Sequence, residues 1–140
     1  MYPEGQEILV VIDDREWRER VARMLGDEGF PITVAAEGLA ALRAVGAQHF
    51  AMVVAAARLP GSLDGATTVR QARTRQPWLK ALFINDASVR HDRSNPDVDD
   101  FIAAPFERHE LIGCTFELLH RVTADMRDLS LRARTALRAS

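Results

Sequence analysis

The amino-acid sequence predicts an α/β fold: a five-stranded, doubly wound parallel sheet with helices on both of its faces. Short apolar runs of strand length alternate with amphipathic segments of helix length along most of the chain, and this alternation is typical of a parallel sheet. The run ILVVI at residues 8–12 is apolar throughout, as expected for a strand that is buried on both faces. Right-handed crossovers leave few arrangements for such a chain, and one five-stranded sheet is the simplest.

The first half of the chain supplies two strand–helix units. After the strand at residues 8–12, Trp17, Val21 and Leu25 recur at helical spacing, so we expect a helix that stops at Gly29. A second short strand is predicted at residues 32–35. The Ala- and Leu-rich segment at residues 38–45 predicts the second helix.

The second half supplies three more strands, which we predict at residues 52–55, 79–84 and 101–103. A helix is predicted at residues 66–75 and ends before Pro77, because proline disfavours helix in the residue that precedes it. Residues 85–96 have almost no apolar periodicity, so we expect a fourth helix that is short or irregular. From Glu107 onward the pattern is helical.

The C-terminal helix is predicted to be long. One apolar stripe with steps of three or four residues runs along it through Leu111, Thr115, Leu118, Val122, Met126, Leu129, Ala133 and Leu137. The stripe outruns what one sheet can cover, so we expect a domain at residues 1–122 and a helical extension at residues 123–140. An exposed stripe normally needs a partner helix, which predicts a dimer through this helix; fraying of the tail is the alternative.

Composition limits the class of protein. The 140 residues fit one domain, and 47% of them are hydrophobic, which is enough for an ordinary core. No apolar run approaches the roughly 20 residues that cross a bilayer, and a chain with Cys114 as its single cysteine can form no internal disulfide. Because the net charge is −2 and the tail is only mildly basic, we expect a cytoplasmic protein with no membrane or nucleic-acid partner.

Five short motifs occur together in a familiar order. They are ILVVIDD at residues 8–14, Gly29-Phe30, AAEGLAAL at 35–42, RLPGSLDG at 58–65 and APF at 104–106. Over residues 7–122 the chain therefore resembles the CheY-like receiver domain of bacterial two-component response regulators. The resemblance implies a flavodoxin-like sheet whose site lies at the carboxyl ends of the strands.

The resemblance also implies roles for individual positions. In this family an acid pair binds Mg²⁺, an aspartate that ends the third strand accepts the phosphoryl group, a hydroxyl residue ends the fourth strand and a lysine precedes the Pro-Phe pair. The acid pair corresponds to Asp13 and Asp14, but the other three positions fall on Ala56, Asn85 and Ala104. The aromatic position that moves on phosphorylation falls on Phe101.

These substitutions predict an atypical, non-phosphorylatable receiver-like module of a two-component phosphorelay, which is not an enzyme and acts by contact with a signalling protein or with itself. No cofactor is expected beyond weak Mg²⁺ binding by Asp13 and Asp14. The alternative function is a receiver-fold module that a small ligand or divalent metal switches by binding in the acidic pocket. Trp17 would then cover that pocket, and Asp86 would either complete the acidic cluster or face solvent.

Two further residues invite a chemical role and have ordinary explanations. Asp64 could be imagined as a substitute phosphoacceptor, but its place before a predicted helix makes it a helix cap. Cys114 lies among apolar helical positions, where a packed or half-buried thiol is the usual state.

Overall fold

The computed structural model describes residues 6–86 and 100–120, and these residues build a parallel sheet of five strands. The strands are β1 (Ile8–Val11), β2 (Ile32–Ala35), β3 (Met52–Ala56), β4 (Lys80–Asp86) and β5 (Asp100–Ala104). Their spatial order is β2-β1-β3-β4-β5, and every neighbouring pair is parallel. The predicted fold class, a five-stranded doubly wound parallel sheet, is confirmed.

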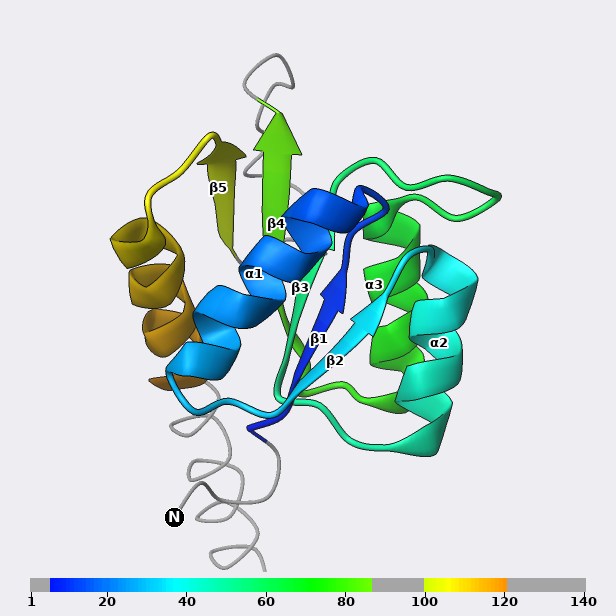
Figure 1. Ribbon diagram of the computed structural model, residues 1–140. Coiled ribbons are helices and arrows are strands. Elements are labelled where there is room, and N and C mark those ends of the chain that lie inside the picture. Colours follow the sequence, from blue (N-terminus) through cyan, green and yellow to red (C-terminus); the bar gives the residue numbers. More distant parts are fainter. Residues whose placement is uncertain (1–5, 87–99, 121–140) are drawn as a thin grey trace, which may run out of the picture.

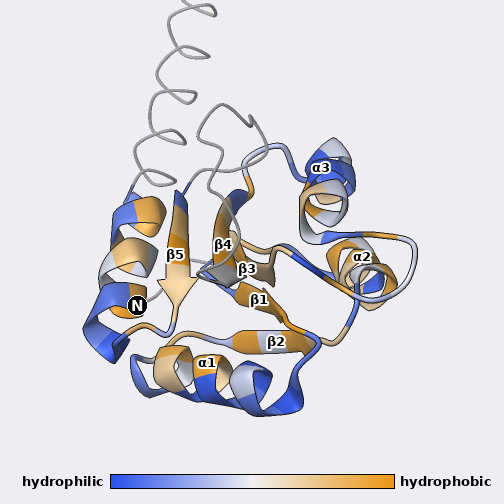
Figure 2. Ribbon diagram, turned by 90° about the horizontal axis from the view of Figure 1, so that it is seen from above, coloured by the Kyte–Doolittle hydropathy of each residue, from blue (hydrophilic) through white to orange (hydrophobic). Residues whose placement is uncertain are grey.

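Helices cover both faces of the sheet. On one face lie α1 (Arg15–Asp27) and the helix that begins at residue 108, described through residue 120; on the other lie α2 (Gly38–Ala47) and α3 (Gly65–Arg75) (Figures 1 and 2). Because each crossover returns the chain to the same edge, all five strands end at one edge of the sheet, where the arrowheads point in Figure 1.

Alternation along β1 divides the core between the two faces. Ile8 and Val10 pack under α1 and the helix of residues 108–120, together with Val21, Leu25, Leu111 and Leu118. Leu9 and Val11 point to the opposite face and pack under α2 and α3. All four residues of β1 are fully buried, which is why this strand is apolar without alternation.

A glycine fixes how closely α3 approaches the sheet. A Cβ added at Gly65 would lie 2.3 Å from the carbonyl oxygen of Ala56 and 3.2 Å from Cα of Ala57. The residue that begins α3 therefore rests directly on the end of β3. This contact shapes the loop that leads away from the carboxyl edge of the sheet.

The boundaries differ from the predicted ones by one or two residues. β4 extends to Asp86, beyond the predicted end at Ile84, because its ladder with β5 continues through the pair Asp86 and Ala104. The helix α2 continues through Gly46 to Ala47. The short or irregular fourth helix was expected within residues 85–96, of which 85 and 86 belong to β4 and the rest lie outside the described residues. The expected extension at residues 123–140 also lies outside them.

Candidate functional site

The carboxyl ends of the central strands surround a cavity of about 510 Å³. Its lining comes from the β1–α1 junction, the end of β3 with the following loop, β4, and the end of β5: Ile12, Asp13, Asp14, Trp17, Ala56, Ala57, Arg58, Ile84, Ala104 and Pro105. Three of these residues are charged, and the others are apolar. The cavity therefore combines apolar walls with a few charged groups, as ligand sites in proteins commonly do.

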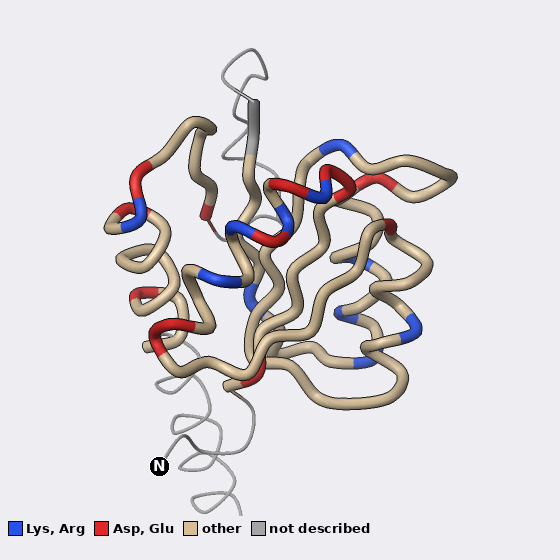
Figure 3. Tube along the Cα trace, viewed as in Figure 1, with Lys and Arg blue, Asp and Glu red and all other residues tan. Residues whose placement is uncertain are grey.

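The acid pair stands where β1 passes into α1. Asp14 is the N-cap of α1, since its Oδ1 accepts a hydrogen bond from the backbone N–H of Trp17 at 3.0 Å. Arg18 reaches back from the first turns of the helix, and its Nη1 donates to the carbonyl oxygens of Ile12 at 2.9 Å and Asp13 at 3.2 Å. These hydrogen bonds fix the backbone of the junction and hold both carboxylates at the cavity. Figure 3 shows charged residues of both signs where β1 runs into α1.

Alanines line the cavity at the ends of β3 and β5. Ala56 and Ala57 are half-buried, and the backbone N–H of Ala57 donates to the carbonyl of Ile84 at 3.2 Å. Ala104 ends β5 and precedes Pro105 through a cis peptide bond. The side chains at these three positions are methyl groups, which offer no nucleophile, no metal ligand and no hydrogen bond.

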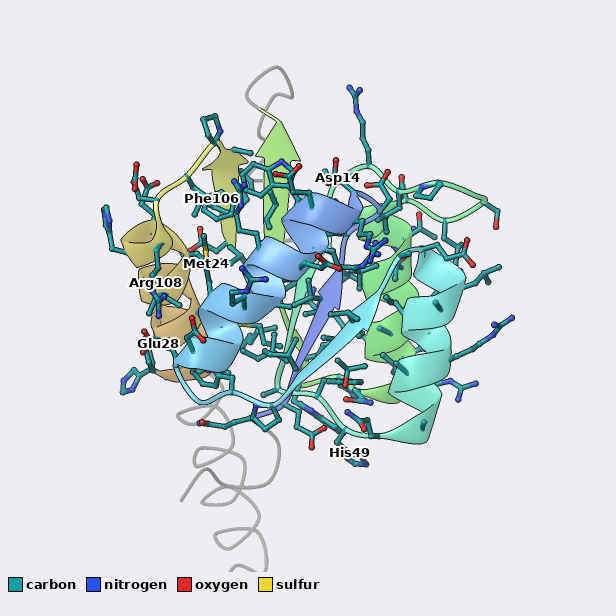
Figure 4. The ribbon with its side chains drawn as sticks, in the orientation of Figure 1. Asp14, Met24, Glu28, His49, Phe106 and Arg108 are labelled. Carbon is teal, nitrogen blue, oxygen red and sulfur yellow. The ribbon has the colours of Figure 1, made fainter. Side chains whose placement is uncertain are left out.

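An aromatic pair forms one side of the site. The ring of Trp17 lies 5.4 Å from the ring of Phe106, centroid to centroid, and the guanidinium of Arg20 lies 5.0 Å from the centre of the Trp17 ring. Phe106, labelled in Figure 4, comes from the segment after β5, so this contact joins that segment to α1. Trp17 itself lines the cavity, and its expected role as a cover for a bound ligand stays a prediction.

The structure brings together most of the residues that the sequence singled out. Asp13, Asp14, Ala56 and Ala104 all line the cavity. Asn85 lies in β4 beside them, but its side chain is not among those described.

Phe101 is placed away from the cavity. It lies in β5, opposite Phe83 of β4, and packs with the residues under α2 and α3. Its expected role as a switch residue stays a prediction.

Sequence reasoning missed Arg58 as a charged residue of the lining and Phe106 as the ring that contacts Trp17. Arg58 lines the cavity, and its signal was its place as the first charged residue after the third strand. Phe106 was noticed as part of the APF motif, but nothing in the linear spacing indicated that its ring would meet that of Trp17. That contact depends on the sheet, which places the end of β5 near the start of α1.

Asp64 and Cys114 lie where their ordinary explanations, a helix cap and a half-buried thiol, place them. Asp64 is the N-cap of α3, and its Oδ1 accepts from the backbone N–H of Thr67 at 2.8 Å. This hydrogen bond is the main reason why the pKa of Asp64 is lowered. Cys114 is half-buried, and desolvation, followed by the nearby charge of Asp100, raises the pKa of its thiol.

The acid pair does not form a complete metal site with the described residues around it. Within residues 6–84 and 100–120, whose side chains are described, no three His, Cys, Asp or Glu side chains gather in a way that could hold a metal ion. One oxygen of Asp14 is already engaged as a helix cap. Two carboxylates alone provide few of the six oxygen ligands that Mg²⁺ prefers.

The family model of the response regulator receiver domain matches residues 8–115. The chain belongs to this family. The receiver domain is 32% identical over 133 residues to the transcriptional activator protein PfeR of Pseudomonas aeruginosa, covering 93% of this chain and 43% of PfeR. It is 33% identical over 121 residues to the response regulator MprA of Mycolicibacterium vanbaalenii, covering 84% and 52%. The chain thus spans about half the length of the curated relatives it matches.

A solved receiver domain has the same fold. The receiver domain of the sensor histidine kinase PA1611 from Pseudomonas aeruginosa superposes with a TM-score of 0.73 at 28% identity, covering 83% of this chain and 98% of that one. That structure holds a magnesium ion coordinated in its active-site cleft. The relatives are named as regulators and signalling proteins rather than as metabolic enzymes.

The comparisons correct one expectation about partners. PfeR is named a transcriptional activator and TctD of Salmonella typhimurium a transcriptional regulatory protein. Since transcription is regulated on DNA, the expectation that this class of protein has no nucleic-acid partner is wrong.

The expected dimer through the C-terminal helix depends on residues 121–140, which lie outside the described part of the chain. In the part that is described, no helix is long and apolar enough to span a membrane.

Proposed function

We propose that this receiver domain is an atypical member of its family that transmits signals without taking up a phosphoryl group at the end of β3. The observation that carries the proposal is Ala56, which occupies the end of β3 and lines the cavity with a methyl group. Alanine has no lone pair to attack phosphorus, and neither pKa nor geometry can supply one. Residues 51–57 contain no carboxylate, so a shift of register by one or two residues does not restore the nucleophile.

The neighbouring positions support the same proposal. Phosphoryl transfer needs positive charge to stabilise the negative charge that spreads over the phosphoryl oxygens. Ala104 precedes Pro105, where the family resemblance leads one to look for a lysine, and it carries no charge. At Asn85 an amide stands in place of a hydroxyl. Asp13 and Asp14 remain, and they are fewer ligands than Mg²⁺ prefers.

Signal output would then depend on contact with another signalling protein, with the receiver module extending over residues 1–122 and residues 123–140 forming an extension. The conformations that favour or oppose this contact would be selected by something other than an acyl phosphate. A small ligand or a divalent metal in the cavity is the second candidate input. The volume and the apolar lining of the cavity favour this second function.

Beryllofluoride tests the proposal, because it mimics a phosphoryl group by binding to a carboxylate oxygen in the presence of Mg²⁺. We expect the backbone amide spectrum of the protein to be the same with Mg²⁺ and beryllofluoride as with Mg²⁺ alone. A receiver domain with an intact site, treated in parallel, is the positive control. Changes in the wild-type spectrum that centre on the ends of β3 and β5 would contradict the proposal.

A further inference from the structure

The cavity at the carboxyl edge has apolar walls and a few charged groups at its opening. Ala56, Ala57 and Ala104 contribute methyl groups, Ile84 and Pro105 contribute aliphatic surface, and Trp17 contributes an aromatic ring. The charged groups are the carboxylates of Asp13 and Asp14 and the guanidinium of Arg58, and all three residues are exposed. The interior is therefore apolar, and the charges lie where the cavity meets solvent.

The apolar walls disfavour a ligand that needs many hydrogen bonds. A hydrated anion that entered would lose water and gain no donor from the alanine, isoleucine or proline side chains. An apolar group gives up no hydrogen bonds to water when it enters. It also removes its own apolar surface and that of the walls from water, which is favourable. The part of a ligand that fills this cavity is therefore apolar.

The carboxylates favour a cation at the mouth. Among the residues described, Asp13 accepts no side-chain hydrogen bond and forms no ion pair. Asp14 uses Oδ1 for the Trp17 N–H. Arg15, the nearest guanidinium along the chain, pairs with Glu19 at 3.1 Å. Arg18 turns its Nη1 to the carbonyl oxygens of Ile12 and Asp13. Two carboxylates against one guanidinium give the described lining residues a net formal charge of −1.

We propose that this cavity binds a small organic cation in which an ammonium group is joined to an apolar body. The ammonium would lie at Asp13 and Asp14, and the apolar body would lie against the three alanines and the ring of Trp17. The proposal deepens the second candidate function and rests on the view that the cavity takes up no phosphoryl group. It differs from a metal site, because most of the contact is with carbon and the cation need not lose its remaining water.

Trp17 provides a specific signal for binding. The chain has two tryptophans, and only Trp17 lines the cavity. Trp78 stacks on His49 with ring centres 5.3 Å apart and donates its Nε1–H to the carbonyl oxygen of Phe50, which precedes β3 at the opposite edge of the sheet. The indole signal of Trp78 is thus an internal reference in the same spectrum.

The test is a titration of the full chain with three probes of nearly equal shape, followed in two-dimensional ¹H–¹⁵N spectra. The probes are 2-phenylethylammonium, neutral 3-phenylpropionamide and anionic 3-phenylpropionate. We expect the ammonium to shift the Trp17 indole and the amides of residues 56 and 57, with the Trp78 indole unchanged. Its affinity should exceed that of the carboxylate at least tenfold, with the neutral amide between them.

Three variants connect the binding to the residues named. Asp13→Asn removes one charge at an exposed position without changing the shape of the side chain. It should weaken the binding of the ammonium several-fold and leave the binding of the neutral amide unchanged. Ala56→Leu narrows the cavity from its apolar wall and should weaken the binding of all three probes. Asp27→Asn is the matched control, because Asp27 pairs with Arg108 away from the cavity; it should change nothing.

Several outcomes would overturn the inference. They are equal or tighter binding of the carboxylate, shifts that spare the Trp17 indole, a loss of affinity in Asp27→Asn as large as in Asp13→Asn, or no saturable binding of the ammonium. Each of these leaves the proposed absence of phosphorylation intact. Uptake of beryllofluoride at the end of β3 would instead overturn that proposal, so the two failures are distinguishable.

Discussion

Single residues decide the chemistry of this receiver domain. The loop geometry at the end of β3 depends on glycine and on backbone hydrogen bonds, and both are present around Ala56. The reaction, in contrast, depends on one side chain at that position, and a methyl group cannot perform it. The sequence was sufficient to predict that Ala56 ends the third strand, and that the chain takes up no phosphoryl group there stays a prediction. The sequence was insufficient for Arg58 and Phe106, whose places depend on how the chain folds over the sheet.

Replacing Ala56 with aspartate separates metal binding from phosphoryl transfer. A third carboxylate beside Asp13 and Asp14 should tighten Mg²⁺ binding by about tenfold or more, because Mg²⁺ prefers oxygen ligands. Phosphoryl transfer from acetyl phosphate should remain slow, since Ala104 and Asn85 still supply neither a cation nor a hydroxyl. Calorimetric titration measures the affinity, and mass spectrometry measures the rate.

The control for this variant is Ala57→Asp, which adds the same charge one residue later in the same cavity lining. It should tighten Mg²⁺ binding less than Ala56→Asp. Equal effects of the two variants would mean that charge alone, and not the position at the end of β3, controls the metal. Rapid phosphorylation of Ala56→Asp would show that Ala104 and Asn85 matter little.

Asp64 contributes stability as a helix cap, with a definite dependence on pH. Its pKa is lowered, chiefly by the hydrogen bond from the Thr67 N–H. The ionised carboxylate therefore stabilises the fold fully above the pKa of about 3.9 that an aspartate has in the unfolded chain. This stabilisation is lost as the pH falls through the lower pKa of the folded state. Asp64→Ala should lower the free energy of unfolding at neutral pH by about 1 kcal/mol.

The matched variant is Asp64→Asn, which keeps a capping oxygen and lacks the titrating group. The free energy of unfolding is measured by urea denaturation at neutral and at acidic pH. At neutral pH, Asp64→Asn should change it only slightly. The difference between wild type and Asp64→Ala should shrink in acid. A difference that stays constant across this range would mean that the cap owes nothing to its charge.

At the scale of elements, β1 and β3 were predicted well because they are buried and consist of continuous apolar runs. The helices were predicted from apolar spacing and from signals such as Asp64 before α3 and Gln76-Pro77 after it. The ends of β4 and α2 were missed by two residues, since strand pairing and helix packing, rather than local sequence, decide where they stop. The positions of these ends depend on contacts between segments that are distant in the sequence.

The contact between α3 and β3 leads to a prediction about glycine. Gly65→Ala should lower the free energy of unfolding by roughly 1–3 kcal/mol, because its Cβ would lie 2.3 Å from the carbonyl oxygen of Ala56. Gly113→Ala, in the helix of residues 108–120, is the control, since a Cβ there has nothing within 4 Å. It should raise stability by up to about 1 kcal/mol. Thermal or urea denaturation of both variants measures the difference, and equal effects would refute the close approach.

At the scale of the whole molecule, one sheet edge gathers the residues on which every proposal here depends. Crossover connections bring the ends of β1, β3, β4 and β5 together although they are separated by most of the chain. Because the fold supplies this edge whatever residues stand on it, a receiver domain can keep its cavity while its reactive side chains change. The fold and the places of Asp13, Asp14 and Ala56 at this edge were therefore predictable from sequence, whereas Arg58 in the lining and the contact between Trp17 and Phe106 required the structure.

Intact mass after incubation with acetyl phosphate and Mg²⁺ tests the central claim most directly. We predict that the wild-type chain keeps its mass, because the end of β3 offers a methyl group and no carboxylate. A receiver domain with an intact site, treated in parallel, should gain the mass of one phosphoryl group and lose it slowly by hydrolysis. The same gain in the wild-type chain, mapped by peptide analysis to an aspartate at the carboxyl edge of the sheet, would contradict the account.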